Sequence, residues 1–345
     1  MVSMAADATA RESGKSMARA VLAQVESDRS IVPDVQRLLA EDLVTIRSRV
    51  EVPPSLKDYM RRVPSGGSEG QVRRLGDGLV AEVTRTTAGT LIAEGDSWFD
   101  YPFHDVLTNL EDDFKFDVES AAHRGDTLES MAYSEAQIAG LYRIIDKAIS
   151  RGDIIRGILI SGGGNDLAGP ELGVLLNHSA TGDPHLSESV MRGVIDERSR
   201  LALLHLLSWI TEAFASKGFP RVPIFVHGYD YPVPDGRGFV GGFGPLPGPW
   251  LEPSFRAKAF NDMPARIAIM RTIIDRFNAM VKSVSESPPF PHVHFVDLRG
   301  TLSTSSDYRD TWANELHPTG KGFKSIAALF ATAIHHATLV NTVDP

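Results

Sequence analysis

The stretch Leu91-Ile92-Ala93-Glu94-Gly95-Asp96-Ser97-Trp98 decides how the rest of the chain is interpreted. An apolar run ends in Gly-Asp-Ser, which is typical of a buried strand that leads into a tight turn. A turn at the end of a strand holds a side chain rigidly at the edge of a sheet. The Ser97 hydroxyl is therefore a candidate nucleophile that is presented to a substrate.

From Thr90 onward, short apolar runs alternate with longer amphipathic stretches. This alternation predicts βαβ units and a parallel sheet with helices on both faces. The predicted strands are 91–94, 116–121, 157–160, 223–227 and 292–297. The predicted helices are 105–110, 135–149, 190–215, 265–284 and 322–335. Because ligands bind beyond the carboxyl ends of such strands, Ser97, Gly125 and Asn165, which each follow a strand, should share one site.

Three later blocks continue the pattern that Gly95-Asp96-Ser97 begins. They are Arg124-Gly125-Asp126-Thr127, Gly163-Gly164-Asn165-Asp166 and His317-Pro318, in that order. The four blocks resemble those of the SGNH (GDSL-type) hydrolases, a family of esterases and lipases, over roughly residues 88 to 338. The resemblance implies an α/β fold of three layers, α/β/α, around a five-stranded parallel, flavodoxin-like sheet.

The resemblance also implies a role for each block. Ser97 corresponds to the nucleophile and His317 to the general base, a pairing that suits acyl transfer because a neutral histidine can take the serine proton. The backbone N–H groups of Ser97 and Gly125 and the Asn165 side-chain amide correspond to the oxyanion hole, which stabilises the negative oxygen of a tetrahedral intermediate. This chemistry needs neither a metal nor a cofactor.

The chain departs from the family three residues before the histidine, where Asn314 stands in place of an acid. A carboxylate there orients the imidazole and stabilises its cation, whereas an amide oxygen brings no charge. We assign Asn314 to the catalytic set with Ser97 and His317, and three interpretations stay open. A backbone carbonyl orients the ring of a serine–histidine dyad, another acid such as Glu315 or Asp310 reaches the histidine, or the site is weakly active.

Aromatic residues cluster near the nucleophile and in a long Gly/Pro-rich segment between residues 229 and 253. A loop of that length and composition after a strand is typical of a lid or binding loop. We therefore expect a substrate pocket for an acyl or aryl group. Its predicted residues are Trp98, Phe99, Tyr101, Phe239, Phe243 and Trp250.

The composition limits the class of partner. The chain has 345 residues, 42% hydrophobic and 23% charged, as in an ordinary globular protein. Its formal charge of -9 disfavours nucleic acid or an anionic membrane as the main partner, and the absence of cysteine excludes disulfides and thiol chemistry. We expect a small-molecule ester as substrate. Without an apolar segment near the N-terminus or long enough to span a bilayer, the sequence predicts a cytoplasmic protein.

The first part of the chain differs in character from the rest. Residues 1–85 read as a helical, polar N-terminal extension, and 86–345 as the hydrolase-like domain. The extension is a candidate cap over the active site, docking segment or dimerisation element, with a packing or homo-oligomer role favoured.

The sequence thus predicts a serine esterase that acts on carboxylic esters through an acyl-serine intermediate. One alternative is a catalytically impaired domain of the same fold that binds a ligand or a protein, and Asn314 is its main support. The other is an esterase that removes acetyl groups from carbohydrate.

Overall fold

A computed structural model describes residues 4–31, 71–75, 78–82, 87–241 and 247–341. The described chain forms two units. One contains the residues up to Val21 together with those from Gly89 onward, and the other lies within Leu22–Ala88.

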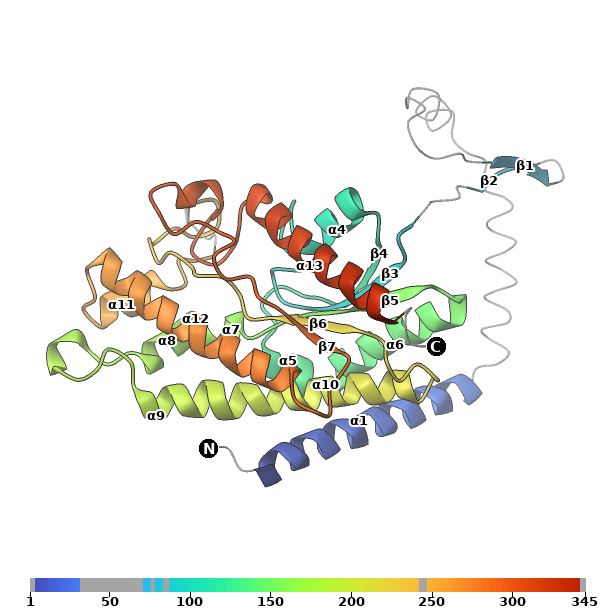
Figure 1. Ribbon diagram of the computed structural model, residues 1–345, viewed down its shortest axis with the longest axis horizontal. Helices are drawn as coiled ribbons and strands as arrows, with labels where there is room; N and C mark the ends of the chain where they lie inside the picture. Colours follow the sequence, from blue (N-terminus) through green and yellow to red (C-terminus); the bar gives the residue numbers. More distant parts are fainter. Residues whose placement is uncertain (1–3, 32–70, 76–77, 83–86, 242–246, 342–345) are drawn as a thin grey trace. The chain divides into compact units, whose positions relative to one another are not determined.

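The larger unit is built on a parallel sheet of five strands, β3 (Thr90–Gly95), β4 (Asp117–Ser120), β5 (Ile155–Ser161), β6 (Ile224–His227) and β7 (Val293–Val296). Their order across the sheet is β4-β3-β5-β6-β7 (Figure 1). This is the flavodoxin-like order, in which the chain first adds a strand on one side of β3 and then on the other. The predicted α/β fold and all five predicted strands are confirmed.

Helices and short turns of helix precede, connect and follow the strands. They are α1 (Met4–Ile31), α4 (Val106–Phe114), α5 (Leu128–Tyr133), α6 (Glu135–Arg151), α7 (Gly164–Leu167), α8 (Pro170–Leu175), η1 (Ser179–Thr181), α9 (Glu188–Met191), η2 (Arg192–Ser199), α10 (Arg200–Ala215), η3 (Phe239–Gly241), α11 (Glu252–Ala257), α12 (Met263–Ser285), η4 (Tyr308–Asp310) and α13 (Gly320–Asn341). The five predicted helices are among them, whereas α5, α7, α8 and α11 are too short for the periodicity to predict. Within the described ranges, no helix combines the length and the apolar character needed to cross a bilayer.

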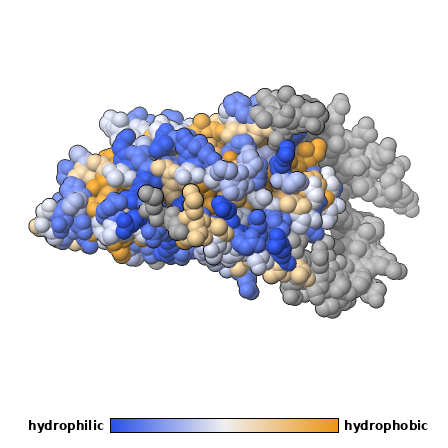
Figure 2. Space-filling view, turned by 60° about the horizontal axis from the view of Figure 1, so that its bottom comes forward, coloured by the Kyte–Doolittle hydropathy of each residue, from blue (hydrophilic) through white to orange (hydrophobic). Residues whose placement is uncertain are grey.

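The helices cover both faces of the sheet (Figure 1). The helices α4 and α13 pack together on one face, and α5, α6 and α12 lie on the other. The helix α10 packs on α5 and α12 and forms a further layer. Figure 2 shows an outer surface in which hydrophilic residues are interspersed with smaller hydrophobic areas.

The first part of α1 packs against α10. Gly14 allows this close approach, because a Cβ at that position would lie 2.3 Å from the backbone oxygen of His205. Asp7 pairs with Arg200, and Arg19 Nε donates a 3.0 Å hydrogen bond to Glu212. The described residues up to Val21 therefore belong with the α/β unit, although the sequence places the boundary near residue 85.

The smaller unit contains an antiparallel hairpin, in which β1 (Gln71–Leu75) pairs with β2 (Gly78–Glu82). Residues 1–85 are predicted to be a helical extension, and that prediction is wrong for residues 71–75 and 78–82. The signal was present, because two residues, Gly-Asp, separate the two runs, and such a spacing is typical of a tight hairpin. Residues 32–70 of the predicted helical extension lie outside the described ranges.

Candidate active site

The four sequence blocks converge at the carboxyl edge of the sheet. Ser97 lies in the turn after β3, Gly125 lies after β4, and Asn165 lies in α7 just after β5. His317 comes from the loop between β7 and α13. The chain adds β4 on one side of β3 and β5 on the other, so the strand order changes direction at β3. Ligands of open α/β sheets bind at such a switch point. The structure thus brings the predicted catalytic and oxyanion residues together.

The serine and the histidine are in direct contact. Ser97 Oγ lies 2.7 Å from His317 Nε2, and His317 Nδ1 lies 3.0 Å from Asn314 Oδ1. This is the nucleophile–base–orienting group arrangement of serine hydrolases, with an amide oxygen in the third place.

Hydrogen bonds determine which face of the Asn314 amide meets the histidine. Its Oδ1 accepts from the backbone N–H groups of Leu316, at 3.0 Å, and His317, at 2.9 Å. Its Nδ2 donates to Tyr101 Oη at 3.0 Å. Because Oδ1 faces His317, Nδ1 carries the ring proton and Nε2 is left to accept the Ser97 hydroxyl proton. The amide therefore selects the tautomer that a general base requires.

Neither of the two other acids reaches the histidine. The buried Glu315 carboxylate accepts hydrogen bonds from the backbone N–H groups of four residues, at 2.7 to 2.9 Å. They are Gly236, Trp250, Leu251 and Glu252. Asp310 is exposed on η4. Glu315 thus holds the Gly/Pro-rich segment between residues 229 and 253 (the aromatic loop) against the loop that carries His317 (the histidine loop). Its position in the sequence did not indicate this role.

The imidazole of His317 is enclosed by aromatic rings. Tyr101 stacks on it with a centroid distance of 4.3 Å, and Trp250 meets it edge-on at 5.4 Å. The side chain is buried, and burial lowers the pKa of His317 to about 3 because its charged form loses hydration. The neutral, basic form of the ring is therefore favoured in the folded protein.

The groups that are predicted to form an oxyanion hole lie beside Ser97. In the described part of the chain, the backbone N–H groups of Ser97 and Gly125 have no protein acceptor. Asn165 Nδ2 donates one hydrogen bond to the Asp126 carbonyl at 2.8 Å, which uses one of the two N–H groups of the amide. Gly125 has a φ of 91°, a conformation that a side chain would strain.

Hydrogen bonds between the loops hold Ser97, Gly125 and His317 in their relative positions. Trp98 Nε1, next to Ser97, donates to the Leu316 carbonyl in the loop before His317 at 2.9 Å. Asp100 accepts from the backbone N–H of Arg124, at 3.0 Å, and from its guanidinium, and so holds the residue before Gly125. The importance of Asp100 was not apparent from the sequence, because its partner lies on another strand connection.

A buried polar network lies beneath Ser97. Asp96 accepts hydrogen bonds from the hydroxyls of Ser161 and Tyr229, and from the backbone N–H of Trp98. His227 accepts from the Tyr229 backbone N–H through Nδ1, so its Nε2 donates to Ser161 Oγ at 2.9 Å. Burial raises the pKa of Asp96 to about 6 and lowers that of His227 to about 3. The network fixes the turn that carries Ser97.

An outer cavity of about 430 Å³ opens in front of Ser97 and His317. Tyr101, Phe239 and Trp250 line it, as the sequence predicts for the substrate site. Asp100 and Arg124 add a charged pair to the same lining.

The other predicted aromatic residues lie elsewhere. Trp98 is buried and lines a smaller, inner cavity on the other side of Ser97. Phe99 lines neither cavity. It is buried in the core against His227 and Phe330, because the turn after Ser97 directs it back under the sheet edge, so its predicted substrate contact is corrected. Phe243 lies outside the described residues.

No family model matches the chain, and no curated protein matches it in sequence. Several solved structures are similar in fold. The lipase Lip_vut3 from a goat rumen metagenome is 15% identical with a TM-score of 0.44, and the match covers 71% of this chain and 96% of that protein.

Two carbohydrate-active esterases are similar as well. A catalytic mutant of Axe2, an acetylxylan esterase from Geobacillus stearothermophilus, is 16% identical with a TM-score of 0.36, over 72% of this chain and 94% of that protein. A family 3 carbohydrate esterase from Clostridium thermocellum is 15% identical with a TM-score of 0.37, over 73% of this chain and 98% of that protein. These identities are too low to transfer an activity or a residue role, so the chemistry of this chain rests on its own geometry.

Proposed function

We propose that the protein is a serine esterase that hydrolyses carboxylic esters through an acyl-serine intermediate. The observation that carries the proposal is the 2.7 Å contact between Ser97 Oγ and His317 Nε2, with His317 Nδ1 held by an amide oxygen. A serine hydroxyl becomes a nucleophile when a positioned base accepts its proton. The substrate is a small-molecule ester that enters through the outer cavity.

The reaction follows from these positions. Ser97 Oγ attacks the ester carbonyl while its proton moves to His317 Nε2, and the carbonyl oxygen becomes an oxyanion. The N–H groups of Ser97, Gly125 and Asn165 stabilise that charge. His317 then gives its proton to the leaving alcohol, and the acyl group stays on Ser97. A water molecule, activated by the same histidine, releases the carboxylic acid and restores the serine.

Asn314 sets the rate at which this cycle runs. Its oxygen orients the ring but carries no charge to stabilise the imidazolium that forms in each half-reaction. We therefore propose a slow esterase. A ligand-binding domain without turnover is the second candidate, and the neutral Asn314 is the observation that favours it.

Labelling with a fluorophosphonate tests the proposal without a choice of substrate. The intact mass of the wild-type protein should increase by one adduct, and Ser97→Ala should remain unmodified. A folded wild-type protein that takes up no adduct over hours would favour the ligand-binding alternative. His317→Ala, with the serine present, should abolish labelling, since the hydroxyl then lacks its base.

A further inference from the structure

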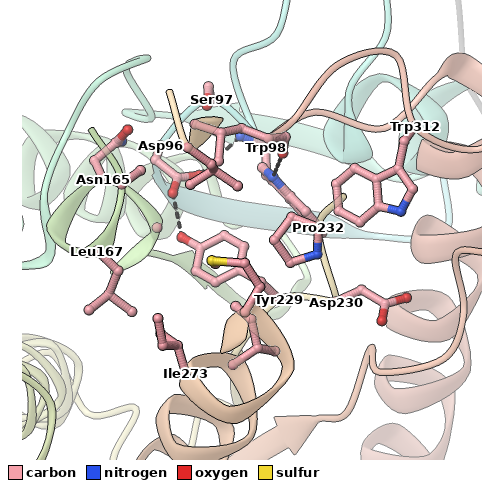
Figure 3. A pocket seen from close by; sticks show the side chains of 16 residues that line it. Asp96, Ser97, Trp98, Asn165, Leu167, Tyr229, Asp230, Pro232, Ile273 and Trp312 are labelled. Atoms are coloured by element: carbon pink, nitrogen blue, oxygen red, sulfur yellow. Dashed lines mark hydrogen bonds between the residues drawn. The ribbon is translucent and has the colours of Figure 1, made fainter. Parts of the chain in front are cut away.

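The inner cavity lies below the turn that carries Ser97 and has a volume of about 50 Å³. Figure 3 shows Ser97 at its upper rim, with its hydroxyl directed away from the floor that Tyr229 and Ile273 form. Ser97, Asn165 and Leu316 line both this cavity and the outer one. A carbonyl bound between Ser97 and Asn165 would therefore lie at the boundary of the two cavities.

The wall of the inner cavity is apolar. Most of its aliphatic and thioether side chains come from α12 and from the segment that follows Asn165, and they are Leu167, Ala168, Met270, Ile273 and Ile274. Pro232, Leu251 and Leu316 complete the apolar lining. The two carboxylates in the wall are already hydrogen-bonded. Asp96 accepts from Ser161, Tyr229 and the Trp98 backbone, while Asp230 accepts from the backbone N–H groups of Tyr231, Gly300 and Leu302. The cavity thus suits a hydrocarbon group.

The position of His317 decides which part of an ester each cavity holds. His317 lines the outer cavity and does not line the inner one. The histidine must protonate the leaving alcohol, so the alcohol has to lie on its side of the carbonyl. The acyl chain leaves the carbonyl in the other direction, over Ser97 and Asn165.

We propose that the inner cavity is the acyl-binding site and that it restricts the enzyme to esters of short, unbranched carboxylic acids. This inference rests on the proposed esterase function. On the scale in which one water molecule needs about 10–15 Å³, a volume of about 50 Å³ accommodates roughly three to five atoms of that size. Acetyl to butyryl groups fit, and an octanoyl chain does not. The outer cavity is larger, and the charged side chains of Asp100 and Arg124 line it. This cavity receives the alcohol.

The floor of the cavity is rigid, so its size is a property of the fold. Tyr229 has a φ of 67°, which is rare for a residue with a side chain, and its hydroxyl donates to Asp96. Asn278 Nδ2 holds this segment through hydrogen bonds to the carbonyls of Gly228, at 2.7 Å, and Tyr229, at 3.2 Å. A long acyl chain cannot push such a floor aside without breaking the network beneath the nucleophile.

Chain-length profiles test the assignment. kcat/KM is measured for the p-nitrophenyl esters of acetate, butyrate, hexanoate and octanoate, which share one alcohol. We expect the wild-type value to fall at least tenfold from butyrate to octanoate. Ile273→Ala enlarges the cavity and should raise the octanoate-to-butyrate ratio at least fivefold. Ile269→Ala is the matched control, because Ile269 is buried on the same helix and lines neither cavity.

A second measurement does not depend on turnover. The rates at which p-nitrophenyl butylphosphonate and octylphosphonate form an adduct on Ser97 should show the same preference and the same response to Ile273→Ala. A profile that is flat from acetate to octanoate, or one that Ile269→Ala changes as much as Ile273→Ala, would overturn the acyl assignment and leave the esterase proposal standing. No adduct on Ser97 with any phosphonate would overturn both.

Discussion

Asn314 holds His317 with an uncharged oxygen, at 3.0 Å from Nδ1. The same oxygen accepts two backbone N–H groups, and the amide nitrogen donates to Tyr101. The orientation of the histidine is therefore that of a serine hydrolase, while the electrostatic stabilisation of its cation is missing. Geometry and charge, which an aspartate supplies together, are separated in this site.

Asn314→Asp should raise kcat for ester hydrolysis by about 10²-fold or more at pH 8. In serine proteases, removal of the charge at the corresponding position lowers kcat by about 10⁴-fold, which sets the scale. The carboxylate would accept the same N–H groups, and the Tyr101 hydroxyl would donate to it. Steady-state kinetics on one ester measure the effect. An unchanged kcat in a folded variant would show that the charge of the third residue does not limit the reaction.

The proposed esterase activity of the wild-type protein should persist in acid. The acidic limb of kcat/KM reports the pKa of the free base. Burial lowers the pKa of His317 from 6.5 to about 3, so the neutral base persists as the pH falls. We expect kcat/KM to be nearly constant from pH 8 to about pH 5, and Asn314→Asp to move the limb upward because a carboxylate favours the imidazolium.

The lowered pKa of His317 also affects folding stability, so the pH profile of kcat/KM needs a control for unfolding. The unfolded chain binds a proton on this histidine below pH 6.5, whereas the folded one does not until about pH 3. The free energy of unfolding therefore decreases as the pH is lowered from 6.5 to about 3. Circular dichroism at each pH separates unfolding from protonation of the base. A wild-type limb at pH 6.5 in a folded protein would contradict the prediction.

Tyr101→Phe should lower kcat about tenfold and leave KM nearly unchanged. The ring still stacks on His317, but the buried Asn314 amide nitrogen loses its acceptor and the amide is held less firmly. Tyr101→Ala, which also removes a wall of the outer cavity, should change both constants. If Tyr101→Phe instead raised KM alone, the hydroxyl would act on the substrate and not through Asn314.

Asn165→Ala should lower kcat by about 10²- to 10³-fold, the usual effect of losing one oxyanion donor. The substitution also frees the Asp126 carbonyl, so thermal unfolding of the variant is needed alongside the kinetics. Asn165→Asp is the informative partner variant. It keeps the size of the side chain but places a negative charge beside the oxyanion, and activity that survived this change would remove Asn165 from the oxyanion hole.

Glu315→Gln should destabilise the protein by about 2–4 kcal/mol, because an NH₂ group would face backbone N–H donors that now have a buried carboxylate. Urea denaturation measures the change. Asp310→Asn is the control, since Asp310 is exposed in the same connection and should shift stability by less than about 0.5 kcal/mol. Equal effects of the two substitutions would mean that Glu315 does not hold the aromatic loop.

The sheet could be predicted because its signals are local. The apolar run before Gly95 and the runs before Ser161 and His227 each ended in a turn, and parallel strands bring such turns to one edge. Ser97 and Asn165 followed from that placement together with the family resemblance. The hairpin of β1 and β2 differs from the helical prediction for residues 1–85, although its two-residue spacing is visible in the sequence.

The sequence by itself determined the alternation of strands and long helices from Thr90 onward, the arrival of Ser97, Gly125 and Asn165 at one edge of the sheet, and the presence of an amide where an acid is usual. Short-range patterns of apolar and turn residues are sufficient for these. Only the tertiary structure decided which side of the Asn314 amide faces His317, that Glu315 binds four backbone N–H groups instead of the histidine, and that Ile273 from a distant helix closes a cavity beneath Ser97. The physical reason is that hydrogen-bond partners decide both cases. The orientation of an amide and the partners of a buried carboxylate depend on groups that are distant in the sequence, and only tertiary packing brings these groups within hydrogen-bonding distance.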